Sequence, residues 1–192
     1  MNIKSIAKQH PSGEIVGDNI ILKKHQIETA EVMFNLVDKD RKRLQEFLPW
    51  VEATTSISDV IEYIKGCLER WEKYEEFTYS MFRKNDQQYM GNVGIHAIRW
   101  NHNKCEMGYW IGSEFEGKGF VREATYLLEQ TMFNLGFNRI VIKCSTRNLR
   151  SVAIPIRLEY RLEGVAYQDV IENDRYDDTM CFAKVKSLLK EN

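Results

Sequence analysis

The stretch FEGKGFVREA, residues 115–124, places two glycines around a lysine and then continues at once into a helical pattern. Apolar side chains at helical spacing follow from Val121 to Leu135. A strand-like run at 104–112 precedes the glycines, and another at 139–145 follows the helix. The order strand, glycine turn, helix, strand requires a parallel crossover if both strands share one sheet.

The glycine turn itself has two interpretations. A turn that opens a helix presents free backbone N–H groups and the positive end of the helix dipole, which together favour a phosphate. Gly117 and Gly119 allow close approach of a ligand, and Lys118 and Arg122 add positive charge. The dinucleotide fingerprint is excluded because Arg122 stands where its third glycine belongs, and no P-loop is present. The alternative is a plain turn that only feeds a helix.

The segments around this unit predict the rest of the fold. Helical spacing predicts helices at 27–37, 57–71 and 148–158. Strands are predicted at 14–24, 77–85, 89–100, 161–170 and 179–186, with a hairpin turn at 101–104. The chain is therefore expected to form an α/β (α+β) fold with a mixed, mostly antiparallel sheet of six to seven strands and helices on both faces. Residues 1–13 are expected to be a leader and 14–192 a single domain.

Composition narrows the function classes. Lys and Arg number 27 against 28 Asp and Glu, so the whole chain has no excess positive charge that would favour nucleic acid. The four cysteines form no C-x-x-C pair and the four histidines have no ligand spacing, so no metal is predicted. No apolar run is long enough for a membrane span, and the N-terminus lacks a signal-peptide pattern. We expect a cytoplasmic protein with no membrane or nucleic-acid partner.

Several segments in order carry a resemblance to a known family: LPW at 48–50, EMGYWIGSEFEGKGFVREA at 106–124, FNRIVIKCSTRNLRSVAIPIRLEYRLEG at 137–164 and RYDDTMCF at 175–182. From about residue 14 onward the chain resembles the Gcn5-related N-acetyltransferases (GNAT), in particular the RimJ/RimL type that modifies ribosomal proteins. The resemblance implies the GNAT acyl-CoA acyltransferase fold. It also implies direct transfer of an acetyl group from acetyl-CoA, the co-substrate, to a primary amine.

The resemblance further implies a set of residues that bind acetyl-CoA. The family's Q/R-x-x-G-x-G/A segment binds the pyrophosphate through backbone amides, and here it falls on 116–121, with departures at Glu116 and Val121. The strand at 105–112 is expected to diverge from the strand at 139–145 and to bind the pantetheine arm through its backbone. The implied cofactor-binding residues are Trp110, Ile111, Gly112, Gly117, Lys118, Gly119, Phe120, Val121, Arg122, Asn148 and Ser151.

Two residues are candidates for catalysis. The attacking amine must lose a proton, and its unperturbed pKa is about 10.4 for lysine or about 7.7–8.0 for an α-amine, so a base is needed. Glu106 is the candidate base, with a solvated strand carboxylate as the alternative. Ser151 is the implied hydroxyl near the departing sulfur, because Pro155 stands where many relatives have a tyrosine. The plainer interpretation makes Asn148 a helix N-cap and Ser151 an ordinary first-turn residue.

The acceptor is not specified by the sequence. The resemblance favours a protein N-terminal α-amine and places Trp50 near the acceptor, whereas Asp177 and Asp178 are expected to be surface or turn carboxylates. An enzyme for a polyamine or an antibiotic amine is one alternative. Departures at Glu116, Val121, Pro155 and Glu159 motivate another, a non-catalytic acyl-CoA-binding or sensing module. A structural protein without a ligand is a third. The oligomeric state is open, with a homodimer among the options.

Overall fold

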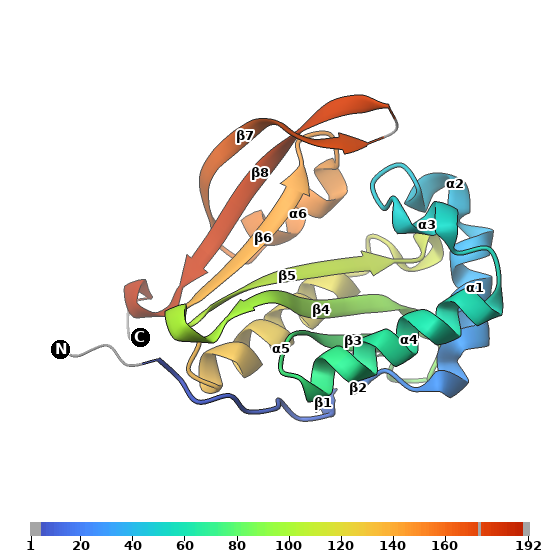
Figure 1. Ribbon diagram of the computed structural model, residues 1–192, viewed down its shortest axis with the longest axis horizontal. Helices are drawn as coiled ribbons and strands as arrows, with labels where there is room; N and C mark the ends of the chain where they lie inside the picture. Colours follow the sequence, from blue (N-terminus) through green and yellow to red (C-terminus); the bar gives the residue numbers. More distant parts are fainter. Residues whose placement is uncertain (1–4, 173, 190–192) are drawn as a thin grey trace.

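The computed structural model describes residues 5–172 and 174–189. Its centre is one eight-stranded sheet in the order β1-β2-β3-β4-β5-β6-β8-β7, shown in Figure 1. Neighbouring strands are antiparallel except β5 and β6, which are parallel. The strands are β1 (Glu14–Val16), β2 (Ile20–Lys24), β3 (Phe77–Arg83), β4 (Tyr89–Arg99), β5 (Lys104–Ile111), β6 (Arg139–Ser145), β7 (Arg161–Glu172) and β8 (Arg175–Val185).

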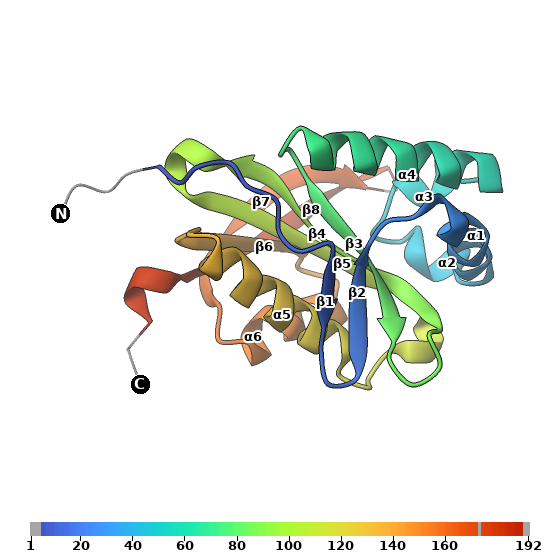
Figure 2. The same ribbon diagram turned by 90° about the horizontal axis from the view of Figure 1, so that it is seen from below.

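The helices cover both faces of this sheet. They are α1 (Ala30–Lys39), α2 (Arg41–Leu44), α3 (Trp50–Ala53), α4 (Ile57–Glu72), α5 (Phe120–Asn134) and α6 (Leu149–Arg157). Figure 2 shows α4 and α1 on one side of the sheet and α5 with α6 on the other. Each long helix buries one apolar stripe, such as Val60, Ile64 and Trp71 of α4, against the strands. The predicted fold class is therefore confirmed.

The sheet has one strand more than the predicted range. The run at 14–24 folds as two strands, because the chain reverses between them and the Gly17 N–H donates to the Ile20 carbonyl at 2.9 Å. The prediction that β8 begins near 179 was also wrong, since pairing with β7 starts at Arg175. Both errors concern hairpins, whose pairing the alternating pattern does not locate.

Two short helices, α2 and α3, had no prediction. Each is four residues long, too short for a 3.6-residue period to be recognised. They depend on tertiary contacts: the Arg41 guanidinium donates to the carbonyl of Val51 at 2.6 Å and to that of Thr54 at 2.7 Å. The Leu-Pro-Trp segment at 48–50 leads into the second of them, with Pro49 at the N-cap of α3.

The separation of β5 from β6 shapes the centre of the molecule. The two strands pair only at Lys104 with Arg139, Cys105 with Ile140 and Glu106 with Val141. Beyond these pairs they diverge, as Figure 1 shows, while β6 stays paired with β8 along its whole length. The predicted divergence of these strands is therefore confirmed, and it opens the sheet between α5, α6 and the short helices.

The segment before β1 packs against the sheet from residue 5 onward. The Ile6 N–H donates to Asn103 Oδ1 at 2.9 Å, and the Tyr79 hydroxyl donates to the Ser12 carbonyl at 2.7 Å. The division into a leader at 1–13 and a single domain at 14–192 stays a prediction. Among the described residues, the helices are too short or too polar to cross a lipid bilayer.

We expect Leu128→Ala to lower the free energy of unfolding by about 2–5 kcal/mol, because this α5 side chain is fully buried against the sheet and its loss leaves a cavity. The matched control on the same helix is Tyr126→Ala, whose side chain is 49% exposed. Urea unfolding followed by circular dichroism measures both. Equal losses in the two variants would contradict the packing of α5 described above.

Stability should also depend on pH through His25. Burial lowers the pKa of His25 to about 4, from an ordinary value of 6.5, and its Nδ1 lies 2.7 Å from Ser80 Oγ. Between these two pKa values the unfolded chain binds a proton that the folded protein excludes. The free energy of unfolding should therefore fall as the pH decreases from 6.5 to about 4. The loss is on the order of 3 kcal/mol. His25→Gln should make the unfolding curve flatter over that range than the wild-type curve.

Candidate active site

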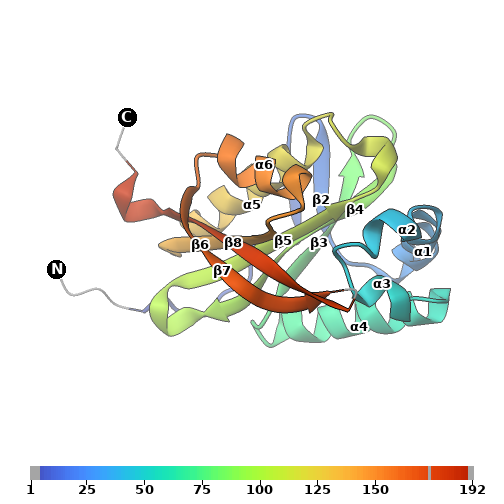
Figure 3. The same ribbon diagram turned by 90° about the horizontal axis from the view of Figure 1, so that it is seen from above.

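A cleft of about 1170 Å³ lies where β5 and β6 separate. Its walls come from α2 and the segment after it, the end of β5, the glycine turn with the start of α5, and α6. Figure 3 shows α6 on one side of β5 and α2 with α3 on the other. The predicted residues that line it are Trp110, Ile111, Gly117, Lys118, Gly119, Phe120, Val121, Arg122, Asn148 and Ser151. Gly112, Glu106 and Trp50 are not part of its wall.

The glycine turn is open toward the cleft. Gly117 has φ +73° and Gly119 has φ +85°, a left-handed conformation that favours glycine. A Cβ atom at either position would meet no atom within 4 Å. Gly119 is the N-cap of α5 and no side chain caps its first turn, so the N–H groups there are available to a ligand. This geometry suits a phosphate group.

The charges in the cleft wall favour an anion. Six cationic side chains line it against two carboxylates, Glu46 and Glu116. The cations are Arg43, Lys118, Arg122, Arg147, Arg150 and Arg157. Glu116, a departure from the family pattern, does not act as an unpaired negative charge, because its oxygens lie 2.7 Å from Arg43 and 3.1 Å from Arg150. The ion pairs offset the repulsion that a carboxylate would exert on a phosphate.

Arg43 was missed by sequence analysis, since it lies in a short helix without a recognisable period. It also donates to the Ile111 carbonyl at 2.6 Å and pairs with Asp40. Asp40 Oδ2 in turn accepts the Ser113 N–H at 2.7 Å, and these hydrogen bonds with Arg43 hold the pKa of the Asp40 carboxyl below its ordinary value despite its partial burial. The network ties α2 to the end of β5.

At the other wall, α6 begins at the cleft. Asn148 Oδ1 accepts the Ser151 N–H at 3.1 Å, so the N-cap interpretation of Asn148 is confirmed. Ser151 Oγ lies 3.2 Å from Cys144 Sγ and 3.4 Å from the Tyr109 hydroxyl. Burial raises the pKa of the Cys144 thiol, so this cysteine stays protonated and is a poor nucleophile.

Glu106 lies on the other side of β5. Successive strand residues point to opposite faces, so Glu106 and Trp110 face away from Tyr109 and Ser151. Glu106 is half-buried, with Lys143 Nζ at 3.2 Å from one oxygen and His96 Nε2 at 4.0 Å from the other. The structure therefore does not bring Glu106 and Ser151 together on one face of the strand.

Trp50 stands beside the cleft rather than in its wall. It is 40% exposed, and its ring centroid lies 5.7 Å from that of Trp110. Because Trp110 shares a strand face with Glu106, the indole of Trp50 lies toward the side that carries Glu106.

The β7–β8 hairpin contains a carboxylate cluster that differs from expectation. Asp177 is buried, not a surface residue as expected. Its charge is compensated there, since Arg147 pairs with it at 3.0 Å and Ser145 Oγ donates to it at 2.6 Å. Burial and the neighbouring Asp177 raise the pKa of Glu172. Sequence patterns carry no signal for these contacts, which join β6, β8 and the start of α6.

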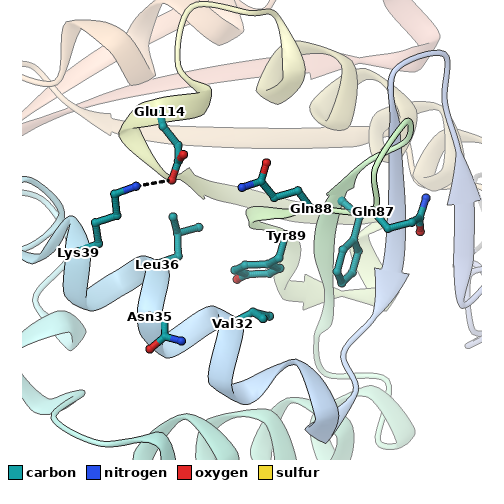
Figure 4. A pocket seen from close by; sticks show the side chains of 9 residues that line it. Val32, Asn35, Leu36, Lys39, Gln87, Gln88, Tyr89 and Glu114 are labelled. Carbon is teal, nitrogen blue, oxygen red and sulfur yellow. Dashed lines mark hydrogen bonds and ion pairs between the residues drawn. The ribbon is translucent and has the colours of Figure 1, made fainter.

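A smaller hollow of about 370 Å³ lies elsewhere, between α1 and the β3–β4 hairpin. Figure 4 shows its floor of Leu36 and Tyr89, with the ion pair of Lys39 and Glu114 at one side, 3.0 Å apart. It includes none of the predicted site residues. The cleft between β5 and β6 is therefore the candidate active site.

Comparison with known proteins agrees with this geometry. The family model described as an acetyltransferase (GNAT) domain matches residues 19–161. The ribosomal-protein-serine acetyltransferase of Escherichia coli is 25% identical over 154 residues, which cover 80% of this chain and 85% of that protein.

Two solved structures are also similar. The microcin C7 self-immunity acetyltransferase MccE, in complex with acetyl-CoA and AMP, has a TM-score of 0.84 and 27% identity, with 88% of this chain and 93% of that chain covered. RimL, the ribosomal L7/L12 α-N-protein acetyltransferase in complex with coenzyme A, has a TM-score of 0.84 and 25% identity, with 89% and 96% covered. With an open glycine turn at a helix N-terminus, a cationic cleft between separated strands and a matching family model, the chain belongs to the GNAT acetyltransferases and is an acetyl-CoA-dependent N-acetyltransferase.

Proposed function

We propose that this enzyme acetylates the N-terminal α-amine of a protein, with acetyl-CoA held across the cleft between β5 and β6. The observation that carries the acetyl-CoA site is the open glycine turn at the start of α5, next to Lys118 and Arg122. The acceptor class is supported by the similarity to the ribosomal-protein-serine acetyltransferase and to RimL. A homodimer, a cytoplasmic location and the absence of nucleic-acid and membrane partners stay predictions.

The pyrophosphate of acetyl-CoA would accept hydrogen bonds from the backbone N–H groups between Gly117 and Val121. Val121 replaces a small residue of the family pattern, but it lines the cleft without closing it. The pantetheine arm contains amide groups, which suit the edge of β5 that β6 leaves beyond Glu106. The other edge of β5 is already paired with β4. Just beyond the strand, the Gly112 N–H donates to the Met90 carbonyl at 2.9 Å.

The acceptor amine would approach from the face of β5 that carries Glu106, opposite the thiol end of the cleft. Glu106 removes a proton from the ammonium, directly or through a water molecule, and Lys143 Nζ lies 3.2 Å from that carboxylate. Trp50 borders the approach. The neutral amine then attacks the thioester carbonyl without a covalent enzyme intermediate, which agrees with the protonated state of Cys144.

When the tetrahedral intermediate collapses, the carbon–sulfur bond breaks and its electron pair moves to sulfur. The Ser151 hydroxyl donates a hydrogen bond to that thiolate, which then takes a proton from solvent. Asn148, which already orients the first turn of α6, lies next to the pantetheine arm in this arrangement. The nitrogen loses two protons in all: one passes to Glu106 before the attack, and the second leaves the nitrogen of the tetrahedral intermediate for solvent, so the products are a neutral amide and, once the thiolate is protonated, coenzyme A.

A small-molecule amine is the second candidate acceptor. It is favoured by the similarity to MccE, whose structure is a complex with acetyl-CoA and AMP. The exposed Trp50 ring, tilted at 56° to Trp110, offers a face on which a planar ring could stack.

The phosphate cradle is tested by calorimetric titration with acetyl-CoA. Gly119→Asp places a negative charge in the open space above the turn, and we expect it to weaken binding at least about tenfold through repulsion of the phosphates. Gly119→Asn is the matched control, because asparagine tolerates the same left-handed backbone without the charge and should weaken binding less.

Two results would contradict the cradle. Equal affinity of Gly119→Asp and wild type would place the phosphates elsewhere. If the wild-type protein gives neither heat nor a rise in melting temperature with acetyl-CoA, the site proposed here is wrong.

The role of Glu106 is tested by Glu106→Gln. We expect kcat to fall by about 10²–10⁴-fold, since the general base is lost, while acetyl-CoA affinity stays unchanged because Glu106 is not in the cleft wall. Glu62→Gln, an exposed carboxylate on α4, is the control. A non-catalytic module predicts binding with no turnover in any variant, and unchanged kcat in Glu106→Gln would assign the base elsewhere.

Acceptor class is decided by mass spectrometry on matched substrates. We expect a peptide with a free α-amine to be acetylated faster than the same peptide with a blocked N-terminus and an internal lysine. The α-amine has the lower pKa, so a larger fraction of it is neutral at pH 7. Faster acetylation of polyamines or aminonucleosides than of either peptide would favour the small-molecule alternative.

A further inference from the structure

Helix α6 contains a proline that leaves one carbonyl of its first turn without a helical donor. In an α-helix the carbonyl of residue 151 accepts the N–H of residue 155. Residue 155 is proline, which lies inside α6 and has no N–H. The Ser151 carbonyl therefore needs a hydrogen-bond donor from outside the ordinary helical pattern.

That donor is the hydroxyl of Tyr109, which reaches the Ser151 carbonyl from β5 at 2.9 Å. The same contact brings the phenolic oxygen to 3.4 Å from Ser151 Oγ. Burial raises the pKa of Tyr109 well above its usual range, so the hydroxyl remains protonated and able to donate at physiological pH. Its hydrogen is committed to the carbonyl, and its lone pairs face the serine hydroxyl.

The contact also spans the opening of the sheet. Tyr109 lies on β5 beyond the last pair with β6, and Ser151 lies on the helix that follows β6. Both side chains line the cleft. The hydrogen bond therefore fixes the distance between the strand that would carry the pantetheine arm and the helix that carries Ser151. Cys144 Sγ is a second neighbour of the serine hydroxyl and lies 3.2 Å from Ser151 Oγ.

We propose that Tyr109 is the positioning residue of the thiol end of the site: its hydroxyl, anchored on the carbonyl that Pro155 leaves without a donor, accepts the Ser151 hydrogen in the free enzyme and so keeps Ser151 Oγ in place until that hydrogen turns to the departing sulfur. This inference rests on the proposed function, in which Ser151 donates to the thiolate. Tyr109 acts through Ser151 and needs no contact with the substrate of its own. Pro155 and Tyr109 are a matched pair, because the absent N–H of one creates the acceptor for the other.

A purely structural role would give Tyr109 only the task of satisfying the carbonyl, and the chain allows the two roles to be separated. Pro155→Ala restores an N–H at residue 155 and thus a helical donor for the Ser151 carbonyl. In the double variant Tyr109→Phe/Pro155→Ala the carbonyl is satisfied, but no phenolic oxygen lies beside Ser151 Oγ. Any effect that survives in this double variant belongs to the oxygen itself.

The experiment compares wild type, Tyr109→Phe, Pro155→Ala and the double variant by kcat, KM for acetyl-CoA and melting temperature. Tyr109→Phe should lower the melting temperature and reduce kcat about tenfold or more, with KM for acetyl-CoA changed less than about twofold. In the double variant the melting temperature should be close to that of Pro155→Ala alone, because the N–H at residue 155 replaces the lost phenolic donor. Its kcat should stay as low as that of Tyr109→Phe. If Tyr109→Phe fails to fold, the test is the comparison of kcat between the double variant and Pro155→Ala, where the double variant should be slower.

A second comparison, in a Ser151→Ala background, tests whether Tyr109 acts through the serine. Adding Tyr109→Phe there should lower kcat no further, because the hydroxyl that it positions is already gone. A further fall of kcat would overturn the positioning role. Recovery of wild-type kcat in Tyr109→Phe/Pro155→Ala would also overturn it and leave Tyr109 a structural donor only.

Failure of the inference differs from failure of the proposed function. If wild type transfers acetyl groups and Tyr109→Phe keeps full kcat, the inference alone is wrong. If wild type binds acetyl-CoA but transfers nothing to any amine, the proposed function is wrong and the inference falls with it, whereas the melting temperatures still report the contact with the carbonyl.

Discussion

The short parallel pairing of β5 with β6 is the constraint on which the site depends. The ladder between them ends at Glu106 and Val141, and the facing backbone edges beyond it separate. Peptide groups at such an edge need water or a ligand, so the opening is a natural binding place for an extended chain with amide groups. The crossover helix α5 begins at this opening, which brings its N-terminus and the glycine turn to the same cleft.

Charge in the cleft is arranged so that the family departure at Glu116 is compatible with an anionic ligand. The carboxylate is paired with Arg43 on one side and Arg150 on the other, and Arg43 continues to Asp40 and the Ile111 carbonyl. These contacts join the short helix α2 to the phosphate side of the cleft. The excess of cations that remains in the wall is what a pyrophosphate requires.

Alternation along β5 separates the chemistry of the two substrates. Glu106 and Trp110 point to one face, and Tyr109 points to the other, toward Ser151 and Cys144. Glu106 lies on one side of β5, and the Ser151 hydroxyl of α6 lies on the other. This arrangement suits a reaction in which the amine comes from the side of Glu106 and the thiol leaves on the side of Ser151. Burial keeps Cys144 protonated beside Ser151, which leaves direct transfer as the route that these side chains support.

The sequence by itself determined the elements that local patterns encode. The strand–turn–helix–strand unit, the glycine turn at its centre and the apolar faces of α4 and α5 all follow from residue spacing within a few positions. Tertiary structure decided the rest. Arg43 pairs with Glu116, and Asp177 is buried against Arg147. The Tyr109 hydroxyl donates to the Ser151 carbonyl, which Pro155 leaves without a helical donor. These contacts join residues 73, 30 and 42 positions apart. No local pattern encodes them, because only the packing of the whole sheet sets their distances.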